Sequence, residues 1–470
     1  MAGILLDFLY GAGLVALSPV WLYRMIRHGR YREGIAQRFG AAPIRYGLQP
    51  VIWVHGVSMG EVNAARAIVA ELHSQLPDYR VAISSTTDTG MAAARRLFAP
   101  DHIVFHWPLD FSLAVRRALD RMRPDLVVLM EGEVWPNFLA ACNRRNVPVV
   151  VVNARMSPDK GYPRYKKLGR IATRMFNRLT AIGAQDESYA QRFLSLGVKP
   201  EKVRVTGMIK FDTAEVADRV EGQEALAAAL GIGPQDKLIV AGGTGPGEEE
   251  MLLKIFGGIK AHHPEARLAI VPRKPERFDE VAKLITAAGF PLVRRSERPD
   301  ARGDSGLPTP YSPLPTAHSQ PPVGSRELGV GSEASRGPVF LGDTMGELRK
   351  FYGLARCIFV GRSLVPMGGS DMIEAAALGK PTAFGPHTFN FPQADDLAAN
   401  GCARVTDAEA LSRQLEAWLA DPVAAQAAGR KVQDYIRTRQ GATRKNVEMI
   451  CRILGREPGP PGAIATEALR

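Results

Sequence analysis

The chain has 470 residues, of which 46% are hydrophobic and 23% charged, so it is long enough for two compact domains and is not a wholly disordered protein. Its 60 Lys and Arg residues outnumber its 48 Asp and Glu residues, and the net charge of +12 favours a nucleic acid, an anionic bilayer surface or a phosphorylated substrate as partner. The 4 cysteines form no metal-ligand spacing, so a reduced compartment is the simpler interpretation.

The N-terminal segment is a candidate membrane anchor. Residues 4–23 are almost wholly apolar, with Asp7 as the one charged residue, and this length is just sufficient to span a bilayer. A cleaved signal peptide carries its positive charges before the apolar run, whereas here they follow it, at Arg24, Arg27, Arg30 and Arg32. We therefore expect residues 1–30 to be a retained anchor that either spans the membrane or lies in its interface, with the following chain on the cytoplasmic side.

Short β-branched runs alternate with amphipathic stretches in the first half of the chain. The runs lie at 51–54, 81–84, 126–130, 147–152, 181–184 and 203–206. Strands of this kind, linked by helices, are typical of a parallel sheet with both faces covered. The pattern predicts a Rossmann-like domain over residues 31–212.

A polar, alanine-rich stretch at 213–236 interrupts this rhythm and is predicted to be a linker. Strands at 237–243, 268–272, 338–342, 357–361 and 381–385 then predict a second Rossmann-like domain over residues 237–454. Within it, the stretch at about 298–337 is rich in Pro, Ser, Gly and Arg and is predicted to be a disordered insertion. Residues 455–470 are predicted to form a flexible tail. The fold class is therefore α/β.

Ligands of open parallel sheets bind at the carboxyl ends of the strands, so residues that follow strands and face the cleft between the two domains are the candidates. Residues 55–61 follow the first strand, and glycines such as Gly60 permit close backbone approach. Ser58 and Glu61 have the spacing of a capping box, in which Glu61 only caps a helix. The alternative is that Glu61 takes a proton from an acceptor hydroxyl.

Two carboxylates, Glu131 and Glu133, follow the strand at 126–130, and Arg155 follows the next strand. Either the carboxylates serve the site, or one of them caps the helix that begins at Pro136 or pairs with an arginine such as Arg155. Lys210 is a further candidate for the same cleft.

The glycine-rich residues 242–250 resemble a phosphate-binding loop but lack the Lys-Ser/Thr ending of a nucleoside-triphosphate site, which disfavours a kinase or ATPase. No GxGxxG fingerprint lies at a strand-to-helix turn, so a nicotinamide enzyme loses support, and no Asp-x-Asp pair is present, so a metal is not expected. Arg273, Lys274 and Arg277 follow a strand and either neutralise a phosphate leaving group or form a solvated helix start.

Gly368 and Gly369 precede a predicted helix whose N-terminal amides attract phosphate, and Ser370 or Asp371 is placed to cap that helix. Glu374 lies one turn in, where it either accepts bonds from ribose hydroxyls or is, like Asp371, a favourable first-turn acid. The loop after the next strand adds two cleft candidates, His387 and Asn390.

These motifs, in this order, resemble those of the Kdo (3-deoxy-D-manno-oct-2-ulosonic acid) transferases of lipopolysaccharide synthesis, from the N-terminal segment to about Phe391. The shared motifs are S-x-G-E, M-E-x-E-x-W-P-N, N-A-R-x-S, P-R-x-x-E-R, G-D-T-M-G-E-L and G-P-H-T-F-N-F, found here at residues 58–61, 130–137, 153–157, 272–277, 342–348 and 385–391. The family commonly has His-Asn or Gln-Asn where Ser370 and Asp371 stand, and frequently His where Lys274 stands.

The resemblance implies a GT-B glycosyltransferase whose first domain binds the acceptor and whose second binds the CMP-sugar. It implies inverting transfer from CMP-Kdo to a lipid A precursor, lipid IVA, with no further cofactor, at the cytoplasmic face of the inner membrane among anionic lipids. From the family, Glu61 is carried over as the general base, Arg273 as a contact to the donor phosphate and Glu374 as a contact to the cytidine ribose.

Two alternatives remain. The first is another membrane-associated GT-B transferase with a UDP-sugar donor. The second is a basic membrane-bound scaffold or a nucleic-acid binder. Only 7% of residues are aromatic, and they do not interleave with basic stretches, which disfavours nucleic acid as the partner.

Overall fold

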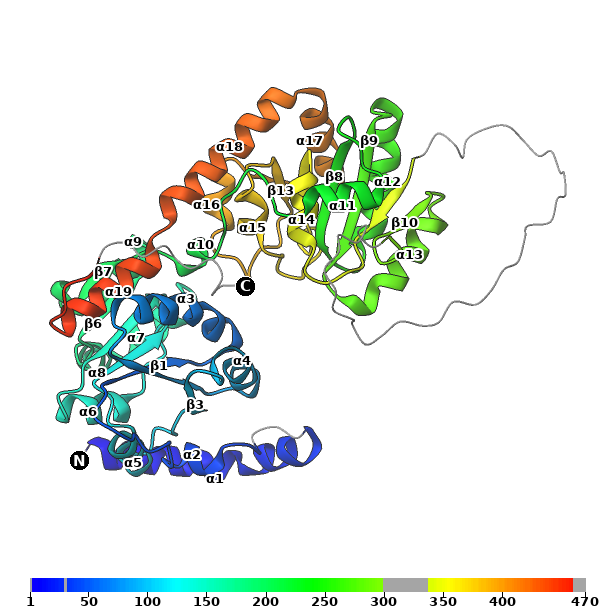
Figure 1. The fold of residues 1–470 in the computed structure, drawn as a ribbon. Helices are drawn as coiled ribbons and strands as arrows, with labels where there is room; N and C mark the ends of the chain where they lie inside the picture. Colours follow the sequence, from blue (N-terminus) through cyan, green and yellow to red (C-terminus); the bar gives the residue numbers. More distant parts are fainter. Residues whose placement is uncertain (1, 29–31, 299–336, 460–470) are drawn as a thin grey trace, which may run out of the picture. The chain divides into compact units, whose positions relative to one another are not determined.

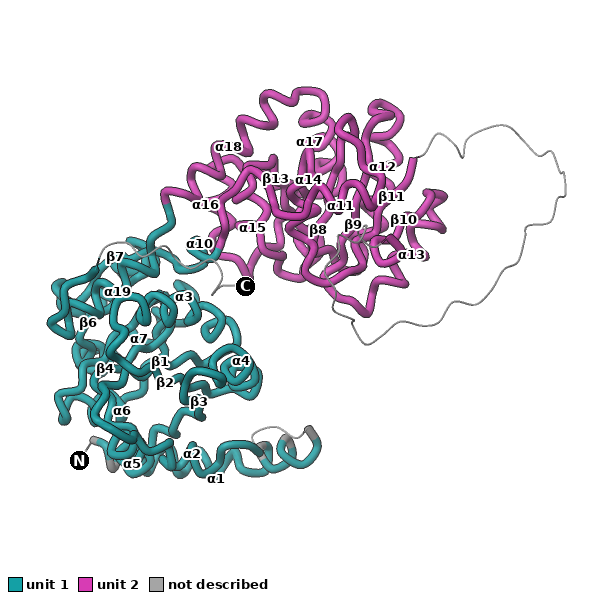
Figure 2. Tube along the Cα trace, in the orientation of Figure 1, with its two compact units in different colours: residues 1–213, 439–470 teal, residues 214–438 magenta. Residues whose placement is uncertain are grey.

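The computed structural model describes residues 2–28, 32–298 and 337–459, which fall into two compact units (Figures 1 and 2). Unit 1 comprises Met1–Thr213 and Arg439–Arg470, and unit 2 comprises Ala214–Thr438. Each unit is built on a seven-stranded sheet with parallel pairing throughout. The predicted α/β class with two parallel-sheet domains is confirmed.

The sheet of unit 1 has the strand order β3-β2-β1-β4-β5-β6-β7. Its strands are β1 (Val51–Gly56), β2 (Arg80–Ser85), β3 (Ile103–His106), β4 (Leu126–Met130), β5 (Val149–Ala154), β6 (Ala181–Ala184) and β7 (Val203–Val205). Successive side chains of a strand point to opposite faces, so Trp53 belongs to one core cluster, while Ile52 and Val54 belong to another. Both faces of the sheet are therefore buried under helices, as the continuous apolar runs predict.

The first core cluster contains side chains from α5, α6, α8 and α9, and the second contains side chains from α3, α4 and α19. The helices of unit 1 are α1 (Ala2–His28), α2 (Ile35–Arg38), α3 (Met59–Gln75), α4 (Asp88–Phe98), α5 (Ser112–Met122), α6 (Pro136–Arg144), α7 (Gly161–Leu168), α8 (Arg170–Phe176), α9 (Glu187–Ser195), α10 (Ile209–Asp212) and α19 (Ala442–Ile453), with a 3-10 turn at Pro200–Lys202.

The sheet of unit 2 has the strand order β10-β11-β9-β8-β12-β13-β14. Its strands are β8 (Lys237–Thr244), β9 (Ala266–Pro272), β10 (Leu292–Arg294), β11 (Val339–Leu341), β12 (Cys357–Val360), β13 (Thr382–Phe384) and β14 (Ala403–Arg404). Its helices are α11 (Gln223–Leu230), α12 (Glu248–His262), α13 (Phe278–Ala287), α14 (Leu348–Leu354), α15 (Met372–Ala376), α16 (Ala394–Ala399), α17 (Ala408–Ala420) and α18 (Pro422–Arg439), with a 3-10 turn at Pro275–Arg277. One face of the sheet packs against α12, α13 and α17.

Each sheet has one point at which the strand order reverses. In unit 1 the chain runs from β1 outward to β3 and then returns to β4 on the other side of β1. In unit 2 it runs from β8 through β9 to β10 at the edge, then to β11 between β10 and β9, and returns to β12 on the other side of β8. Ligands of open parallel sheets bind at the carboxyl ends of the strands at such a reversal. The topology therefore predicts that ligands bind near the turns after β1, β4, β8 and β12.

Two predicted domain boundaries differ from the structure. The second domain was expected to run to residue 454, but α19 packs on α3 and belongs to unit 1. The Asp212 carboxylate accepts the N–H groups of Gly441 (2.7 Å) and Ala442 (3.3 Å), and so caps α19 from unit 1. The predicted linker at 213–236 lies in unit 2 and contains α11. The predicted insertion at about 298–337 and most of the predicted tail at 455–470 lie outside the described residues.

The N-terminal segment that was expected to be a membrane anchor forms the helix α1, and it is fixed to the body of unit 1 near its start. The Asp7 carboxylate accepts the Ser112 N–H (2.9 Å) and the Asn137 side-chain amide (3.1 Å). The Tyr10 hydroxyl donates to Asp110 (3.3 Å). Among the helices of residues 2–28, 32–298 and 337–459, none combines the length and the apolar character needed to cross a bilayer.

Candidate active site

Glu61 lies at the strand reversal of unit 1, in the first turn of α3, with Ser58 as the N-cap. The Ser58 hydroxyl accepts the Glu61 N–H (3.4 Å), which is one half of the predicted capping box. The Glu61 carboxylate accepts the Val57 N–H (2.9 Å) and the Ser58 hydroxyl (3.0 Å), so it bonds to the residue before the N-cap instead of the N-cap amide itself. The Ser58 half of the predicted capping box is therefore present, whereas the Glu61 half is directed to Val57.

The electrostatic setting of Glu61 suits a proton acceptor. Its side chain is buried, and burial is the main cause that raises its pKa to about 7. The Val57 and Ser58 hydrogen bonds lower this pKa, while the negative charges of Glu131 and Glu133 raise it. A carboxylate with a pKa near 7 is half ionised at neutral pH and is a much stronger base than an ordinary glutamate.

The turn after β4 brings a second carboxylate to the same reversal. Glu131 has a positive φ of 60°, and its carboxylate forms an ion pair with Arg155 Nε at 2.6 Å. Burial raises the pKa of Glu131, and Arg155 opposes that rise. Glu133 is exposed. Of the roles left open for Glu131, the pairing with Arg155 is the one that the structure contains.

Neither Glu131 nor Glu133 caps α6. That role belongs to Asp110, whose buried carboxylate accepts the N–H groups of Asn137 (3.0 Å) and Phe138 (2.8 Å). Burial raises the pKa of Asp110 to about 6. Sequence reasoning missed Asp110, because a capping residue 26 positions before the N-terminus of α6 leaves no local signal.

The remaining candidate of unit 1, Lys210, lies on the short helix α10. Asn153 fixes this helix, because its side-chain oxygen accepts the Ile209 N–H (3.1 Å). Asn153 itself has a φ of 53°, in the left-handed region that few non-glycine residues adopt. The strand end at β5 therefore positions both Arg155 and the helix that carries Lys210.

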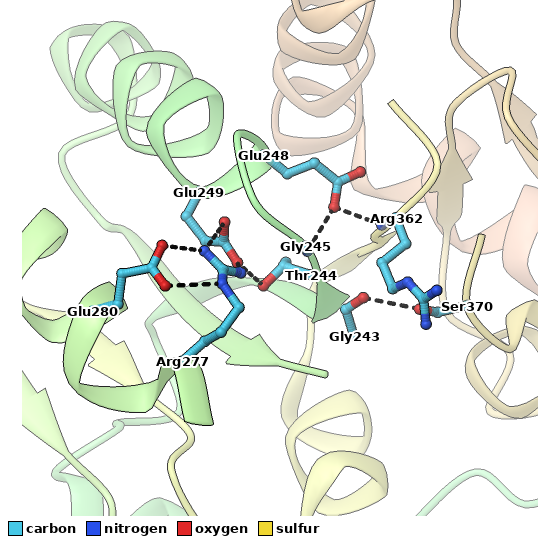
Figure 3. Close-up of polar contacts among 9 residues, drawn as sticks. All are labelled: Gly243, Thr244, Gly245, Glu248, Glu249, Arg277, Glu280, Arg362 and Ser370. Atoms are coloured by element: carbon cyan, nitrogen blue, oxygen red, sulfur yellow. Dashed lines mark hydrogen bonds and ion pairs between the residues drawn. The ribbon is translucent and has the colours of Figure 1, made fainter. Parts of the chain in front are cut away.

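In the glycine-rich stretch at residues 242–250, an internal carboxylate takes one of the backbone amides that a phosphate-binding loop would offer. This carboxylate belongs to Glu248, a fully buried residue. It accepts the N–H group of Gly245 (3.0 Å) and that of Arg362 (Figure 3). It also accepts the N–H groups of Ser363 (2.9 Å) and Leu364 (3.0 Å), which follow β12. An internal carboxylate thus joins the turns after β8 and β12.

Replacing Glu248 by Gln is expected to lower the free energy of unfolding by about 2–4 kcal/mol, because an amide cannot accept all of these buried N–H groups. Chemical denaturation monitored by circular dichroism measures the change. Glu250→Gln, a matched substitution of an exposed residue on the same helix, should change the value by less than about 0.5 kcal/mol. Equal unfolding free energies for the two variants would contradict this role for Glu248.

The three basic residues after β9 do not act as one cluster. Arg277 is buried and pairs with Glu249 at 2.6 Å and with Glu280 at 2.9 Å (Figure 3). Arg277 therefore fits neither of the two alternatives left open for these residues, because it is buried instead of solvated and two carboxylates already pair with it. Arg273 and Lys274 are exposed, and the Arg273 N–H donates to the Thr244 carbonyl (3.1 Å), which holds Arg273 beside the end of β8.

The paired glycines lie next to the same turns. Gly368 and Gly369 have φ values of 87° and 86°, and a Cβ at Gly368 would collide with the Asn390 side chain. The Ser370 hydroxyl donates to the Gly243 carbonyl (2.8 Å), which ties this loop to the end of β8 (Figure 3). The Asn390 side chain donates to the Met367 carbonyl (3.4 Å).

The predicted helix after the paired glycines is α15, which has only five residues and is capped by Asp371 through the Ile373 N–H (3.0 Å). Glu374 is half-buried on α15, and its negative charge contributes to the raised pKa of Tyr352. The His387 N–H donates to the Ser363 carbonyl (2.9 Å), so His387 also lies at the end of β12. The unit 2 candidates therefore gather around the reversal between β8 and β12.

Arg362 also lies at this reversal, although sequence reasoning did not single it out. Only Gly361 separates it from the end of β12, and its side chain lies beside the turn after β8. A cation close behind a strand at a topological reversal was a signal that could have drawn attention to it. Within the part of the chain that the structure describes, no three His, Cys, Asp or Glu residues come together as a possible metal site.

Comparison with known proteins adds the following. Residues 33–213 match the family model of the 3-deoxy-D-manno-octulosonic-acid transferases (kdotransferases). The 3-deoxy-D-manno-octulosonic acid transferase of Bordetella pertussis is 33% identical over 94% of this chain and 97% of its own length. The enzyme of the same name from Haemophilus influenzae is 30% identical over 96% of this chain and 99% of its own length.

Two solved structures share the fold. A UDP-GlcNAc 2-epimerase from Neisseria meningitidis aligns with a TM-score of 0.53 at 15% identity, covering 86% of this chain and 100% of that one. A glycosyltransferase from Rickettsia africae aligns with a TM-score of 0.51 at 14% identity, covering 87% of this chain and 99% of that one. At these identities the likeness concerns the fold alone, and it supports two parallel-sheet domains of the GT-B kind.

Proposed function

The chain belongs to the 3-deoxy-D-manno-octulosonic acid (Kdo) transferase family, and from this premise we propose that it transfers Kdo from CMP-Kdo to a hydroxyl group of a lipid A precursor, lipid IVA. Membership makes it a Kdo glycosyltransferase of lipopolysaccharide synthesis. The observation that carries the mechanism is the buried Glu61 carboxylate, whose pKa lies near 7 at the strand reversal of unit 1.

Glu61 is the proposed general base. It accepts the proton of the acceptor hydroxyl as the oxygen of that hydroxyl attacks the anomeric carbon of Kdo. The bond from this carbon to the phosphate oxygen breaks on the opposite side, the electron pair leaves with CMP, and the configuration is inverted. No covalent intermediate is required. The Val57 and Ser58 hydrogen bonds orient the carboxylate for this step.

The donor is proposed to bind at the strand reversal of unit 2. Arg273 is exposed beside the end of β8, where its guanidinium can neutralise the charge that develops on the leaving phosphate. Gly368, Gly369 and Ser370 form the neighbouring loop, which the Ser370 hydroxyl ties to the end of β8, and Glu374 is the proposed contact to the ribose hydroxyls. The proposed general base, Glu61, thus belongs to unit 1, and the proposed donor contacts belong to unit 2.

A UDP-sugar is the alternative donor, because the Neisseria meningitidis epimerase compared above was solved bound to UDP-GlcNAc. Equilibrium titration of the purified full chain with CMP and with UDP distinguishes the two. CMP is expected to bind more tightly by a factor of ten or more, about 1.4 kcal/mol. Tighter binding of UDP than of CMP would contradict the assignment of CMP-Kdo as the donor.

We further propose that α1 holds the enzyme at the cytoplasmic face of the inner membrane by lying in the interface. Its exposed large side chains are Leu5, Phe8, Leu9, Val15, Leu17, Val20, Leu22, Tyr23 and Ile26. The Asp7 and Tyr10 hydrogen bonds hold its first part on unit 1, so the exposed apolar side is free to enter the headgroup boundary. The net charge of +12 favours binding to a membrane surface that contains anionic lipids. Failure of the full chain to float with anionic vesicles would refute this attachment.

A further inference from the structure

Arg362 has a backbone conformation that an arginine adopts only at a cost. Its φ is 58°, in the left-handed region that glycine enters freely and other residues rarely occupy. Among the described residues of unit 2 it is the one non-glycine residue with a positive φ. Such strain persists where the surroundings enforce it, and it concentrates at functional sites.

The surroundings enforce the conformation through backbone bonds. The Arg362 N–H donates to Glu248, and the Arg362 carbonyl accepts the Gly369 N–H (2.7 Å). The residue is thereby fixed between the turn after β8 and the paired-glycine loop. The backbone would be held equally well by a glycine at this position, so the bonds do not explain why the side chain is an arginine.

The guanidinium of Arg362 lacks the counter-ion that the neighbouring buried arginine has. Arg277 is neutralised by Glu249 and Glu280, whereas Arg362 forms no ion pair among the residues that the structure describes. Its Nη2 donates to the Met367 carbonyl (3.3 Å), and its Nε–H is enclosed without a hydrogen-bond acceptor. A half-buried cation with incomplete hydrogen bonding is held at a cost, which a bound oxyanion would offset.

The position of the side chain matches a donor-binding role. A Cβ at Gly245 would lie 3.1 Å from Arg362 Cγ and 2.7 Å from Met367 Sδ, so glycine at 245 makes room for this side chain. Figure 3 shows the Arg362 side chain extending toward the contact between Ser370 and Gly243. This is the reversal between β8 and β12, where open sheets bind ligands.

We propose that Arg362 binds an oxyanion of the donor, either the nucleotide phosphate or the sugar carboxylate, through its guanidinium. The proposal rests on the proposed function, since it takes a CMP-linked sugar acid as the ligand. The planar guanidinium offers paired N–H donors that match phosphate and carboxylate oxygens, which a lysine ammonium does not. The strained backbone is retained because it aims this group at the donor.

Arg362→Gly tests the proposal, because it removes the guanidinium and suits the left-handed backbone. Titration of the full chain should show CMP affinity lowered by about tenfold or more and cytidine affinity unchanged if the phosphate is the partner. If the carboxylate is the partner, CMP affinity stays constant while the KM for CMP-Kdo rises by about tenfold. Arg362→Lys keeps the positive charge but not the paired N–H donors of the guanidinium, so its affinity for the same ligand should be partly reduced.

Arg123→Gly is the matched control, because Arg123 is an exposed arginine of unit 1 with a φ of 43°. It should leave CMP affinity and the KM unchanged. Thermal unfolding of Arg362→Gly is expected at the parent temperature or above. Unchanged CMP affinity together with unchanged KM in both Arg362 variants would overturn the proposal, as would an equal loss of cytidine affinity. If the parent chain itself bound neither CMP nor CMP-Kdo, the proposed donor would be wrong instead.

Discussion

Glu61→Gln is expected to lower the rate of Kdo transfer by a factor of about 100 to 10,000, because the amide cannot accept the proton of the acceptor hydroxyl. The glutamine retains the local contacts, since its oxygen can accept the Val57 N–H and its NH2 group can donate to the Ser58 hydroxyl. The initial rate of product formation by the purified chain measures the effect. The loss should appear in kcat, with little change in the KM for the donor.

The pH dependence of the parent enzyme should follow the same carboxylate. With a pKa of about 7 for Glu61, the rate should fall about tenfold per pH unit below pH 7 and level off above it. The Glu61→Gln enzyme should not show this decrease of the rate at low pH. A group whose folded pKa is raised contributes stability below its unfolded pKa and loses it as the pH rises through the folded pKa. Glu61→Gln should therefore be at least as stable as the parent at pH 8.

Asp186→Asn is the control for this pair of expectations. Asp186 is the N-cap of α9 in the same unit, where its carboxylate accepts the Tyr189 N–H (2.8 Å), and asparagine caps helices about as well as aspartate. An acid-to-amide change at a helix start with no proposed part in the proton transfer should leave the rate close to that of the parent. A folded Glu61→Gln enzyme with near-parental rates would confine Glu61 to its capping role.

Arg273→Ala is expected to lower kcat by about 100- to 1,000-fold, because the departing CMP phosphate loses a preorganised positive charge. The effect should exceed that on CMP affinity, since the charge on the phosphate grows as the bond to Kdo breaks. Stopped assays at saturating CMP-Kdo measure kcat, and equilibrium titration measures the CMP affinity.

Arg413→Ala provides the comparison in the same unit. Arg413 forms an exposed ion pair with Glu409 on α17 at 2.9 Å, and its loss should change neither kcat nor CMP affinity. If Arg273→Ala behaved like Arg413→Ala in both measurements, the leaving-group role would pass to other residues of the reversal, with Arg362 the first to consider.

Most of the fold could be predicted from the sequence, because central parallel strands are buried on both faces and their apolar runs stand out. The predicted runs at 126–130 and 181–184 coincide with β4 and β6. Three short strands at sheet edges, β3, β10 and β14, were not singled out, because edge strands have one strand partner and a weaker apolar signal. The assignment of α19 to unit 1 depends on packing against α3 and on Asp212, which act over more than 200 positions.

The site was predictable where it depends on residues directly after strands. Glu61, Glu131 and Arg155 lie at strand ends as expected, although Arg155 is the partner of Glu131. The roles of the unit 2 residues were harder to predict, because internal carboxylates bind some of the groups that a ligand could bind. The sequence does not show that Arg277, unlike Arg273, forms an ion pair with the buried Glu249. In the same way, the sequence of residues 242–250 does not reveal that the Glu248 carboxylate accepts the N–H groups of Gly245, Ser363 and Leu364.

The central claim is that Glu61 acts as the base for transfer of Kdo from a CMP-linked donor to a lipid A precursor. Mass spectrometry of the lipid after incubation with the purified full chain and CMP-Kdo tests it most directly. The account predicts that the parent enzyme converts the lipid to a species heavier by one or more Kdo units, with stoichiometric release of CMP, and that Glu61→Gln leaves the lipid unchanged on the same timescale. An unchanged lipid with the parent enzyme, or equal conversion by both proteins, would contradict it.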